Sequence, residues 1–115
     1  MKPMVSLCIT SYNRLEKLRS CIDSFFMTNM YDTDSLELVI VDNGSDSDVV
    51  EYIRGLQPPC AEFKFVLNEI NKYPYCLRAA KNQAREVATG EYFIDCPDDH
   101  LFVFKSDWIS ETIGY

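Results

Sequence analysis

Residues 36–41 read Leu-Glu-Leu-Val-Ile-Val, a run too apolar for a strand with one face in water. Runs of this kind are typical of parallel strands that are buried on both faces of a sheet. Parallel neighbours cannot be joined by a tight turn, so a crossover segment, usually a helix, must separate them. The rest of the chain should therefore alternate between helices and strands.

The sequence has this alternation. Hydrophobic periodicity predicts strands at 5–9, 36–41, 63–67 and 92–96, and helices at about 13–27, 49–56, 77–88 and 107–113. Asn13 with Glu16 resembles a capping box for the first helix, and Gly90 is expected to close the third. The order predicts an α/β fold, a three-layer, mostly parallel sheet of about four strands with flanking helices. A chain of 115 residues suffices for one core, so we expect a single domain over 1–115.

Polar residues follow each predicted strand where it leaves the sheet. They are Thr10, Ser11 and Tyr12 after the first, Asp42 and Asn43 after the second, Asn68 after the third, and Asp98 and Asp99 after the fourth. In a parallel sheet these ends share one edge, where ligands bind at the point at which strand order reverses. Adjacent carboxylates favour a hard divalent cation, Mg²⁺ or Mn²⁺, although Pro-Asp-Asp is also common in surface turns.

A phosphate ligand at this edge would need a counter-charge, because neither common glycine-rich phosphate loop occurs in the sequence. A metal ion on Asp99 could supply that charge, with help from a basic residue near a helix start. The basic candidates are Arg14, Arg78 and Lys81. Tyr12 offers a ring for base stacking, and Asp42 offers an acceptor for a base or ribose donor. Each residue also has a structural interpretation: a packing aromatic, a turn residue or a solvated helix surface.

Four segments in the order and spacing of a known family cover nearly the whole chain. They are VSLCITSYNR (5–14), LVIVDNGS (38–45), AKNQA (80–84) and GEYFI leading to Asp98-Asp99 (90–99). Together they resemble the nucleotide-sugar-binding half of glycosyltransferase family 2, which has the GT-A fold.

The resemblance implies a nucleotide-diphospho-sugar donor across the strand ends, and inverting transfer of its sugar to an acceptor hydroxyl. Thr10 and Tyr12 would flank the base, and Asp42 would meet the base or ribose. Asp99 would be the main ligand of a diphosphate-bound Mn²⁺ or Mg²⁺, with Asp98 beside it and nearer the ribose. The catalytic base is expected in an acceptor-binding half that this chain lacks, so no base is assigned.

The sequence departs from the family pattern at three positions. Pro97 and His100 stand where many relatives have further acidic residues, and His100 is expected at the rim of the site rather than on the metal. Asn43 replaces a frequent second aspartate, which leaves the base preference open.

Two other functions remain open. A missing half would leave C-terminal apolar residues exposed, so the chain could be a non-catalytic module that binds a nucleotide or a partner, or that self-associates. These residues are Leu101, Phe102, Phe104 and Trp108. A phosphate-accepting regulatory domain of similar layout is disfavoured, because its acidic cluster should gather around earlier strands.

Charge and cysteine usage limit the partners and the compartment. A formal net charge of -7 opposes non-specific attraction to nucleic acid or to anionic membranes. Five widely spaced cysteines without a Cys-x-x-Cys pair indicate reduced thiols rather than a disulfide framework or a zinc site. There is no long apolar run and no signal-peptide pattern. The sequence therefore predicts a cytoplasmic location, either free or peripheral to a membrane.

Overall fold

The structure is a computed structural model that describes residues 4–70 and 77–114. The strands are β1 (Val5–Ser11), β2 (Leu36–Asp42), β3 (Glu62–Leu67) and β4 (Tyr92–Pro97). The helices are α1 (Leu15–Thr28), the 3-10 turn η1 (Thr33–Ser35), α2 (Ser47–Arg54), α3 (Leu77–Val87) and α4 (Trp108–Ile113). The predicted alternation is present along the described chain.

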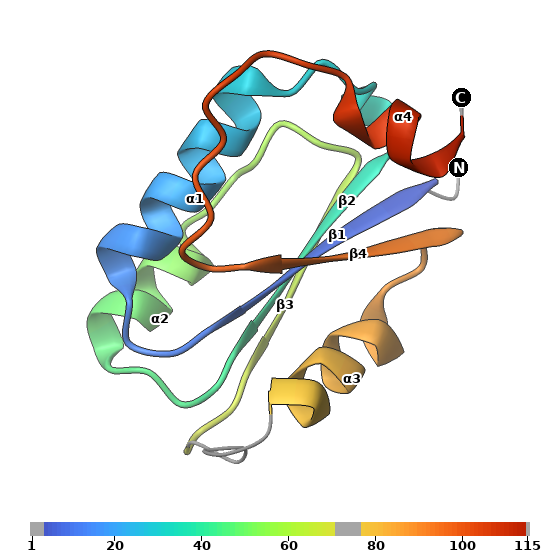
Figure 1. Ribbon diagram of the computed structural model, residues 1–115. Coiled ribbons are helices and arrows are strands. Elements are labelled where there is room, and N and C mark those ends of the chain that lie inside the picture. Colours follow the sequence, from blue (N-terminus) through green and yellow to red (C-terminus); the bar gives the residue numbers. More distant parts are fainter. Residues whose placement is uncertain (1–3, 71–76, 115) are drawn as a thin grey trace.

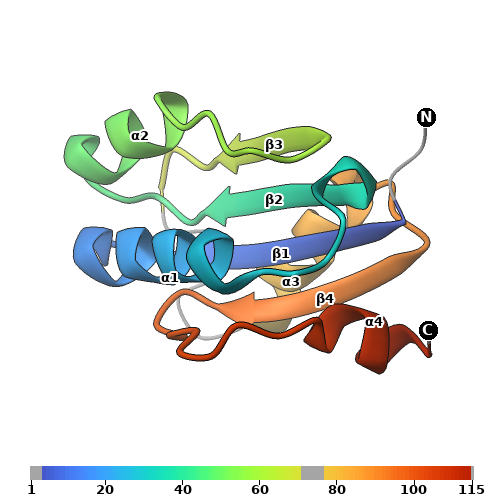
Figure 2. The same cartoon turned by 90° about the horizontal axis from the view of Figure 1, so that it is seen from above.

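The four strands form one parallel sheet in the order β3-β2-β1-β4. Helices α1 and α2 cover one face, and α3 covers the other (Figure 1, Figure 2). This arrangement confirms the predicted three-layer α/β fold. The chain moves outward from β1 through β2 to β3 and then returns to the other side of β1. Strand order therefore reverses between β1 and β4, where such sheets bind ligands.

The central strands are buried on both faces because each face packs against a helical layer. Leu7 and Ile9 point toward α1 and α2, where they join a cluster with Phe25. Cys8 points the other way and packs with Ala84 of α3. Every residue of β2 is buried, as its apolar run predicts. The edge strands β3 and β4 are only partly covered.

After β4 the chain leaves the sheet and runs back along α1 to α4 (Figure 1). The Phe102 amide donates to Ser24 Oγ of α1 at 3.0 Å. The Phe102 and Trp108 rings stack with centroids 5.9 Å apart, and both meet Phe25 edge-on. The prediction that all four C-terminal apolar residues lie exposed is therefore wrong for Phe102 and Trp108, which α1 partly covers.

Gly90 does not close α3, contrary to the sequence prediction. The helix ends at Val87, three positions earlier. A Cβ added at Gly90 would lie 2.7 Å from Ser6 Oγ and 2.8 Å from the Ser6 amide nitrogen. The Gly90 amide donates to Ser6 Oγ at 2.9 Å. Gly90 is thus required by the close approach of this turn to β1 rather than by a helix terminus.

Candidate functional site

A cleft of about 510 Å³ lies at the carboxyl ends of β1 and β4, where strand order reverses. Thr10 of β1 and Asp95 of β4 contribute from the sheet, and Ala80 and Lys81 of α3 contribute from the helix that covers this face. The volume is within the range of small-ligand sites in proteins. Among the described residues, the cleft is lined by Thr10, Ser11, Tyr12, Arg14, Asn43, Ala80, Lys81, Asp95, Pro97, Asp98 and Asp99.

Most of the site residues chosen from the sequence come together in this cleft. They are Thr10, Tyr12, Arg14, Lys81, Asp98 and Asp99. Tyr12 is 45% exposed and lines the cleft, so a ligand in the cleft can contact it. Arg78 belongs to the first turn of α3, but its side chain lies outside the described part of the structure.

Arg14 supplies the positive charge that the two adjacent carboxylates need. Its Nη1 donates to Asp98 Oδ1 at 3.1 Å and lies 3.6 Å from Asp99 Oδ2. Burial raises the pKa of Asp98, the Arg14 guanidinium lowers it, and the charge of Asp99 raises it again, so the pKa remains above its ordinary value. The Asp98 side chain is only 10% exposed, whereas that of Asp99 is 48% exposed. Asp99 is therefore the more accessible carboxylate of the pair.

The donor set at the turn fits a divalent ion only in part. Among residues 4–70 and 77–114, no three histidine, cysteine or carboxylate side chains converge as a metal site. Mg²⁺ sites, however, often combine one or two carboxylates with phosphate oxygens of the ligand. Asp99, half-exposed and next to Asp98, suits that kind of shared site. The protein side chains and a diphosphate would then complete the coordination together.

Asp42 lies just behind the cleft and not on its surface. Its side chain is fully buried, where Oδ2 accepts from the Ser45 amide at 2.9 Å and Oδ1 accepts from Ser45 Oγ. Direct contact with a base or ribose therefore requires the buried carboxylate to become exposed, and this contact stays a prediction. Its neighbour Asn43, by contrast, lines the cleft.

The predicted capping box at the start of α1 is wrong. Asn13 adopts a left-handed conformation with φ of 48°, and α1 begins at Leu15 without a side-chain cap. The Asn13 amide donates to Ser45 Oγ at 2.8 Å, and its Oδ1 accepts from the Asp46 amide at 2.7 Å. Asn13 thus ties the loop after β1 to the loop after β2. This tie fixes the position from which Tyr12 enters the cleft.

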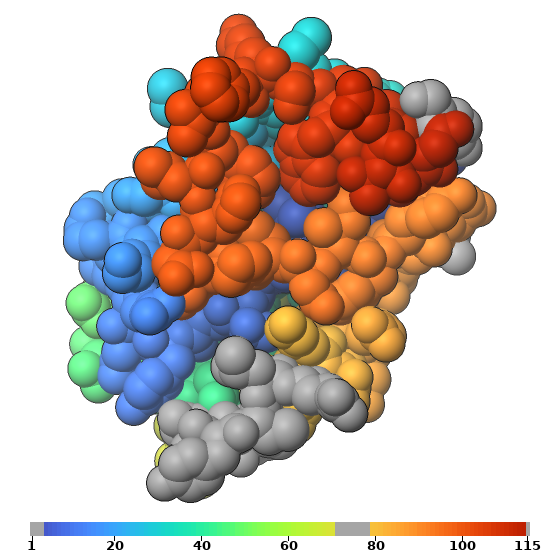
Figure 3. Space-filling model, in the orientation of Figure 1, coloured from blue at the N-terminus to red at the C-terminus, as the bar shows by residue number. Residues whose placement is uncertain are grey.

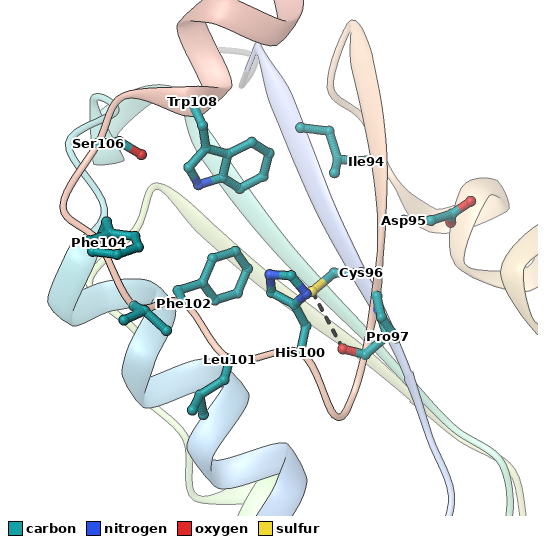
Figure 4. Close-up of a pocket in the computed structure, with 11 residues that line it drawn as sticks. Ile94, Asp95, Cys96, Pro97, His100, Leu101, Phe102, Phe104, Ser106 and Trp108 are labelled. Carbon is teal, nitrogen blue, oxygen red and sulfur yellow. Dashed lines mark hydrogen bonds between the residues drawn. The ribbon is translucent and has the colours of Figure 1, made fainter.

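Asp95 is a cleft residue that sequence reasoning missed. The run 92–96 is apolar on average, so it was predicted as a strand without a site residue, although it contains one carboxylate. Because side chains alternate along a strand, Asp95 projects to the α3 side while Cys96 projects to the α1 side. Figure 4 shows Asp95 pointing away from Cys96 across β4. Pro97 lines the cleft, and the residue two positions before it on the strand, Asp95, faces the same side of the sheet. Strand alternation was therefore the signal that could have identified Asp95.

His100 lies on the α1 side of β4, away from the cleft. It borders a second cavity, of about 640 Å³, between β4 and the segment that returns along α1 (Figure 3, Figure 4). Its ring packs edge-on against Phe102, with centroids 4.4 Å apart. This cavity is lined mainly by apolar side chains, so it does not suit a charged diphosphate. The polar cleft is the better candidate site.

Known proteins resemble this chain in sequence and in fold. Residues 6–115 match the sequence model of the family described as Glycosyl transferase family 2. The chain is also 30% identical over 113 residues to "Uncharacterized protein y4gI" of Sinorhizobium fredii (strain NBRC 101917 / NGR234). That match covers 97% of this chain and 12% of the other protein.

Solved structures share the fold. S. aureus TarS matches with a TM-score of 0.78 and 17% identity over 96% of this chain and 19% of TarS. TarS 1–349 in complex with UDP matches equally well, over 31% of its length. The mannosyltransferase PcManGT from Pyrobaculum calidifontis, in complex with GDP-Man and Mn²⁺, matches with a TM-score of 0.73 and 24% identity, over 88% of this chain and 29% of that one. The chain thus spans less than a third of each relative. No helix in the described residues could cross a membrane.

Proposed function

Because the chain belongs to glycosyl transferase family 2, we propose that it binds the nucleotide-diphospho-sugar donor of a glycosyltransferase in the cleft between β1 and β4. One observation carries this proposal: residues from four separated segments line a single cleft at the switch point. They include Tyr12, Asn43, Lys81 and Asp99. Structures with the same fold are in complex with UDP and with GDP-Man and Mn²⁺, which supports a nucleotide at this edge.

The proposed roles follow from position and chemistry. The accessible Tyr12 ring would stack on the base, next to Thr10. Asp42 would contact the base or ribose once its buried carboxylate becomes exposed, or would act through Ser45. Lys81, with Arg78 in the same helix, would approach the diphosphate from α3.

The charge balance of the cleft supports a metal ion in donor binding. Among the side chains that the structure describes, three carboxylates line it, on Asp95, Asp98 and Asp99, against the two cations of Arg14 and Lys81. A diphosphate would be repelled from such a surface unless further positive charge accompanied it. Asp99 and Asp98 would hold the Mn²⁺ or Mg²⁺, which when bound stabilises the negative charge of the departing nucleoside diphosphate. Arg14 would orient the Asp98–Asp99 turn toward it.

The chain provides the donor side of the reaction in this proposal. An acceptor hydroxyl attacks the anomeric carbon with inversion, and a general base removes its proton. We assign the base and the acceptor site to a further segment, because the matched relatives are more than three times longer than the region they share with this chain. A cytoplasmic location stays a prediction from the sequence.

A non-catalytic binding module with this fold is the second candidate. The exposed Leu101 and Phe104 side chains favour it, because apolar surface recruits partners. Transfer or hydrolysis of a labelled sugar donor by the protein would exclude this alternative.

Calorimetry with UDP, dTDP and GDP, each with and without Mn²⁺, tests the proposal. We expect at least one nucleotide to bind more tightly with Mn²⁺, and Asp99→Asn to weaken that binding about tenfold or more, the effect of losing one charged contact. Asp23→Asn is the matched control, since Asp23 is an exposed carboxylate on α1. Absence of any nucleotide binding, or binding indifferent to both Mn²⁺ and Asp99→Asn, would overturn the proposal.

A further inference from the structure

Two free cysteines from distant parts of the chain meet beneath the Asp98–Asp99 turn. Cys21 of α1 and Cys96 of β4 are 75 positions apart in sequence, and their sulfur atoms lie 3.8 Å apart. Both sulfurs also approach the Pro97 carbonyl oxygen, Cys21 at 3.6 Å and Cys96 at 3.5 Å. The pair therefore sits directly against the residue that precedes Asp98.

One of the two cysteines lines a cavity that a small molecule can enter. Cys21 is fully buried, whereas Cys96 is 7% exposed and lines the cavity of about 640 Å³. Figure 4 shows Cys96 on the same side of β4 as the rings of His100 and Phe102. The same cavity is lined by exposed side chains, including Phe104, so it communicates with solvent. A small oxidant can thus reach Cys96 without unfolding the core.

The two thiols differ in their access to solvent. Cys96 lines the open cavity, whereas Cys21 is fully buried beside it. A thiol that borders a solvent-connected cavity and lies next to a second, resolving thiol is the arrangement of redox-sensitive cysteine pairs.

We propose that Cys21 and Cys96 are a covalent modification site, at which hydrogen peroxide oxidises the two thiols to a disulfide that links α1 to the end of β4. The Cys96 thiol loses its proton as its sulfur attacks one peroxide oxygen, the O–O bond breaks, and the released hydroxide takes up that proton to form water. Cys21 sulfur then attacks the resulting Cys96 sulfenic acid. The S–S bond forms, the S–O bond breaks, and the departing hydroxide leaves with the Cys21 proton as a second water.

Disulfide formation changes the structure that supports the Asp98–Asp99 turn of the proposed donor site. The sulfurs must approach from 3.8 Å to about 2.05 Å, which draws the end of β4 and α1 together. Oxidation also removes both S–H groups that face the Pro97 carbonyl. Because Arg14 leads into α1 and Asp98 follows Pro97, the Arg14–Asp98 contact shifts as well. We expect weaker nucleotide binding, and this consequence rests on the proposed function.

The covalent step is tested on the folded wild-type protein. Reduced protein is treated with hydrogen peroxide, remaining thiols are blocked by alkylation, and the protein is analysed by intact mass and peptide mapping. We expect the loss of two hydrogen atoms, a peptide pair that joins Cys21 to Cys96, and a Tm higher by about 5 °C or more, reversed by dithiothreitol. Treated protein without this peptide pair, or with a disulfide between other cysteines, would overturn the proposal.

Variants separate the roles of the two thiols. Cys21→Ala leaves Cys96 without a resolving thiol, so a sulfenic-acid probe should label Cys96 in this variant more than in the wild type. Cys60→Ser is the control and should form the disulfide normally. Equal labelling of Cys96 in Cys21→Ala and wild type would contradict the pairing. The wild-type peptide map decides the question even if Cys21→Ala fails to fold.

Nucleotide binding distinguishes this proposal from the proposed function. Calorimetry on reduced and oxidised wild type should show affinity lower by about threefold or more after oxidation. Oxidised Cys21→Ala should lose less affinity, because no link forms. If the reduced protein binds no nucleotide, the proposed function fails, while peptide mapping still decides the disulfide. Equal affinity in the two redox states would overturn the link between this modification and the cleft.

Discussion

The pKa of Asp98 depends on two neighbouring charges of opposite sign. Arg14→Gln removes the cation that lowers this pKa, so the pKa of Asp98 should rise further. Asp99→Asn removes the anion that raises it, so the pKa should fall. Carboxyl-detected NMR titration of the side chain measures both shifts.

Arg19→Gln provides the matched control for Arg14→Gln. Arg19 is similarly exposed and pairs with Glu16 at 3.3 Å, on the surface of α1. It should leave the pKa of Asp98 unchanged. A pKa of Asp98 that falls in Arg14→Gln would show that the ion pair at the cleft does not form in solution.

At the scale of elements, the turn between α3 and β4 depends on Gly90. Gly90→Ala places a methyl group less than 3 Å from backbone atoms of β1, so we expect a loss of about 2 kcal/mol or more in the free energy of unfolding. Urea denaturation measures it. Gly55→Ala is the control, because the nearest atom to its added Cβ is 3.4 Å away and its φ of -88° suits alanine. Equal effects of the two substitutions would contradict this role of Gly90.

At the edge of the sheet away from the cleft, Glu37 links neighbouring strands in a buried polar cluster. It accepts from Ser6 Oγ at 2.6 Å and from the Thr89 amide at 2.9 Å, and it pairs with Lys64 Nζ at 2.8 Å. Burial opposes ionisation of Glu37, but these hydrogen bonds outweigh it and lower the pKa to about 2. The cluster thus ties β1, β2, β3 and the turn before β4 at one edge of the sheet.

This lowered pKa predicts the acid sensitivity of the fold. The ionised Glu37 stabilises the protein fully above its ordinary pKa of 4.5, and that contribution is lost as pH falls toward about 2. The loss should be about 3 kcal/mol, because each pKa unit corresponds to about 1.4 kcal/mol. Denaturant titrations across this pH range should show a flatter profile for Glu37→Gln. Glu16→Gln, on the exposed surface of α1, is the control and should keep the pH dependence of the free energy of unfolding seen in the wild type. The same pH dependence in Glu37→Gln and in the wild type would show that Glu37 is not the source of the acid sensitivity.

For the whole molecule, the exposed apolar side chains beside β4 predict self-association. Leu101 and Phe104 are 57% and 83% exposed, next to the edge of the sheet. We expect concentration-dependent dimers in sedimentation velocity, weakened by Leu101→Ser with Phe104→Ser. Met27→Ser removes a comparably exposed side chain from α1 and should change nothing. A wild-type protein that stays monomeric at all concentrations would count against this prediction.

The fold was predictable because its signals are local. The apolar run at 36–41 became β2, and the helical periodicity of Leu18, Ile22 and Phe25 became the buried face of α1. The polar strand ends were also predictable, and a parallel sheet necessarily brings them to one edge. Thr10, Tyr12, Arg14, Lys81, Asp98 and Asp99 therefore reached one cleft as expected.

The sequence by itself thus determined the α/β architecture and which strand ends meet at one edge of the sheet, since hydrophobic periodicity and turn chemistry depend on neighbouring residues. Only the tertiary structure decided that Arg14 pairs with Asp98, that Asn13 ties two loops instead of capping a helix, and that Cys21 meets Cys96. Each of these contacts joins residues more than thirty positions apart. Such contacts exist only once helices and strands have packed at fixed distances, so no local pattern could specify them.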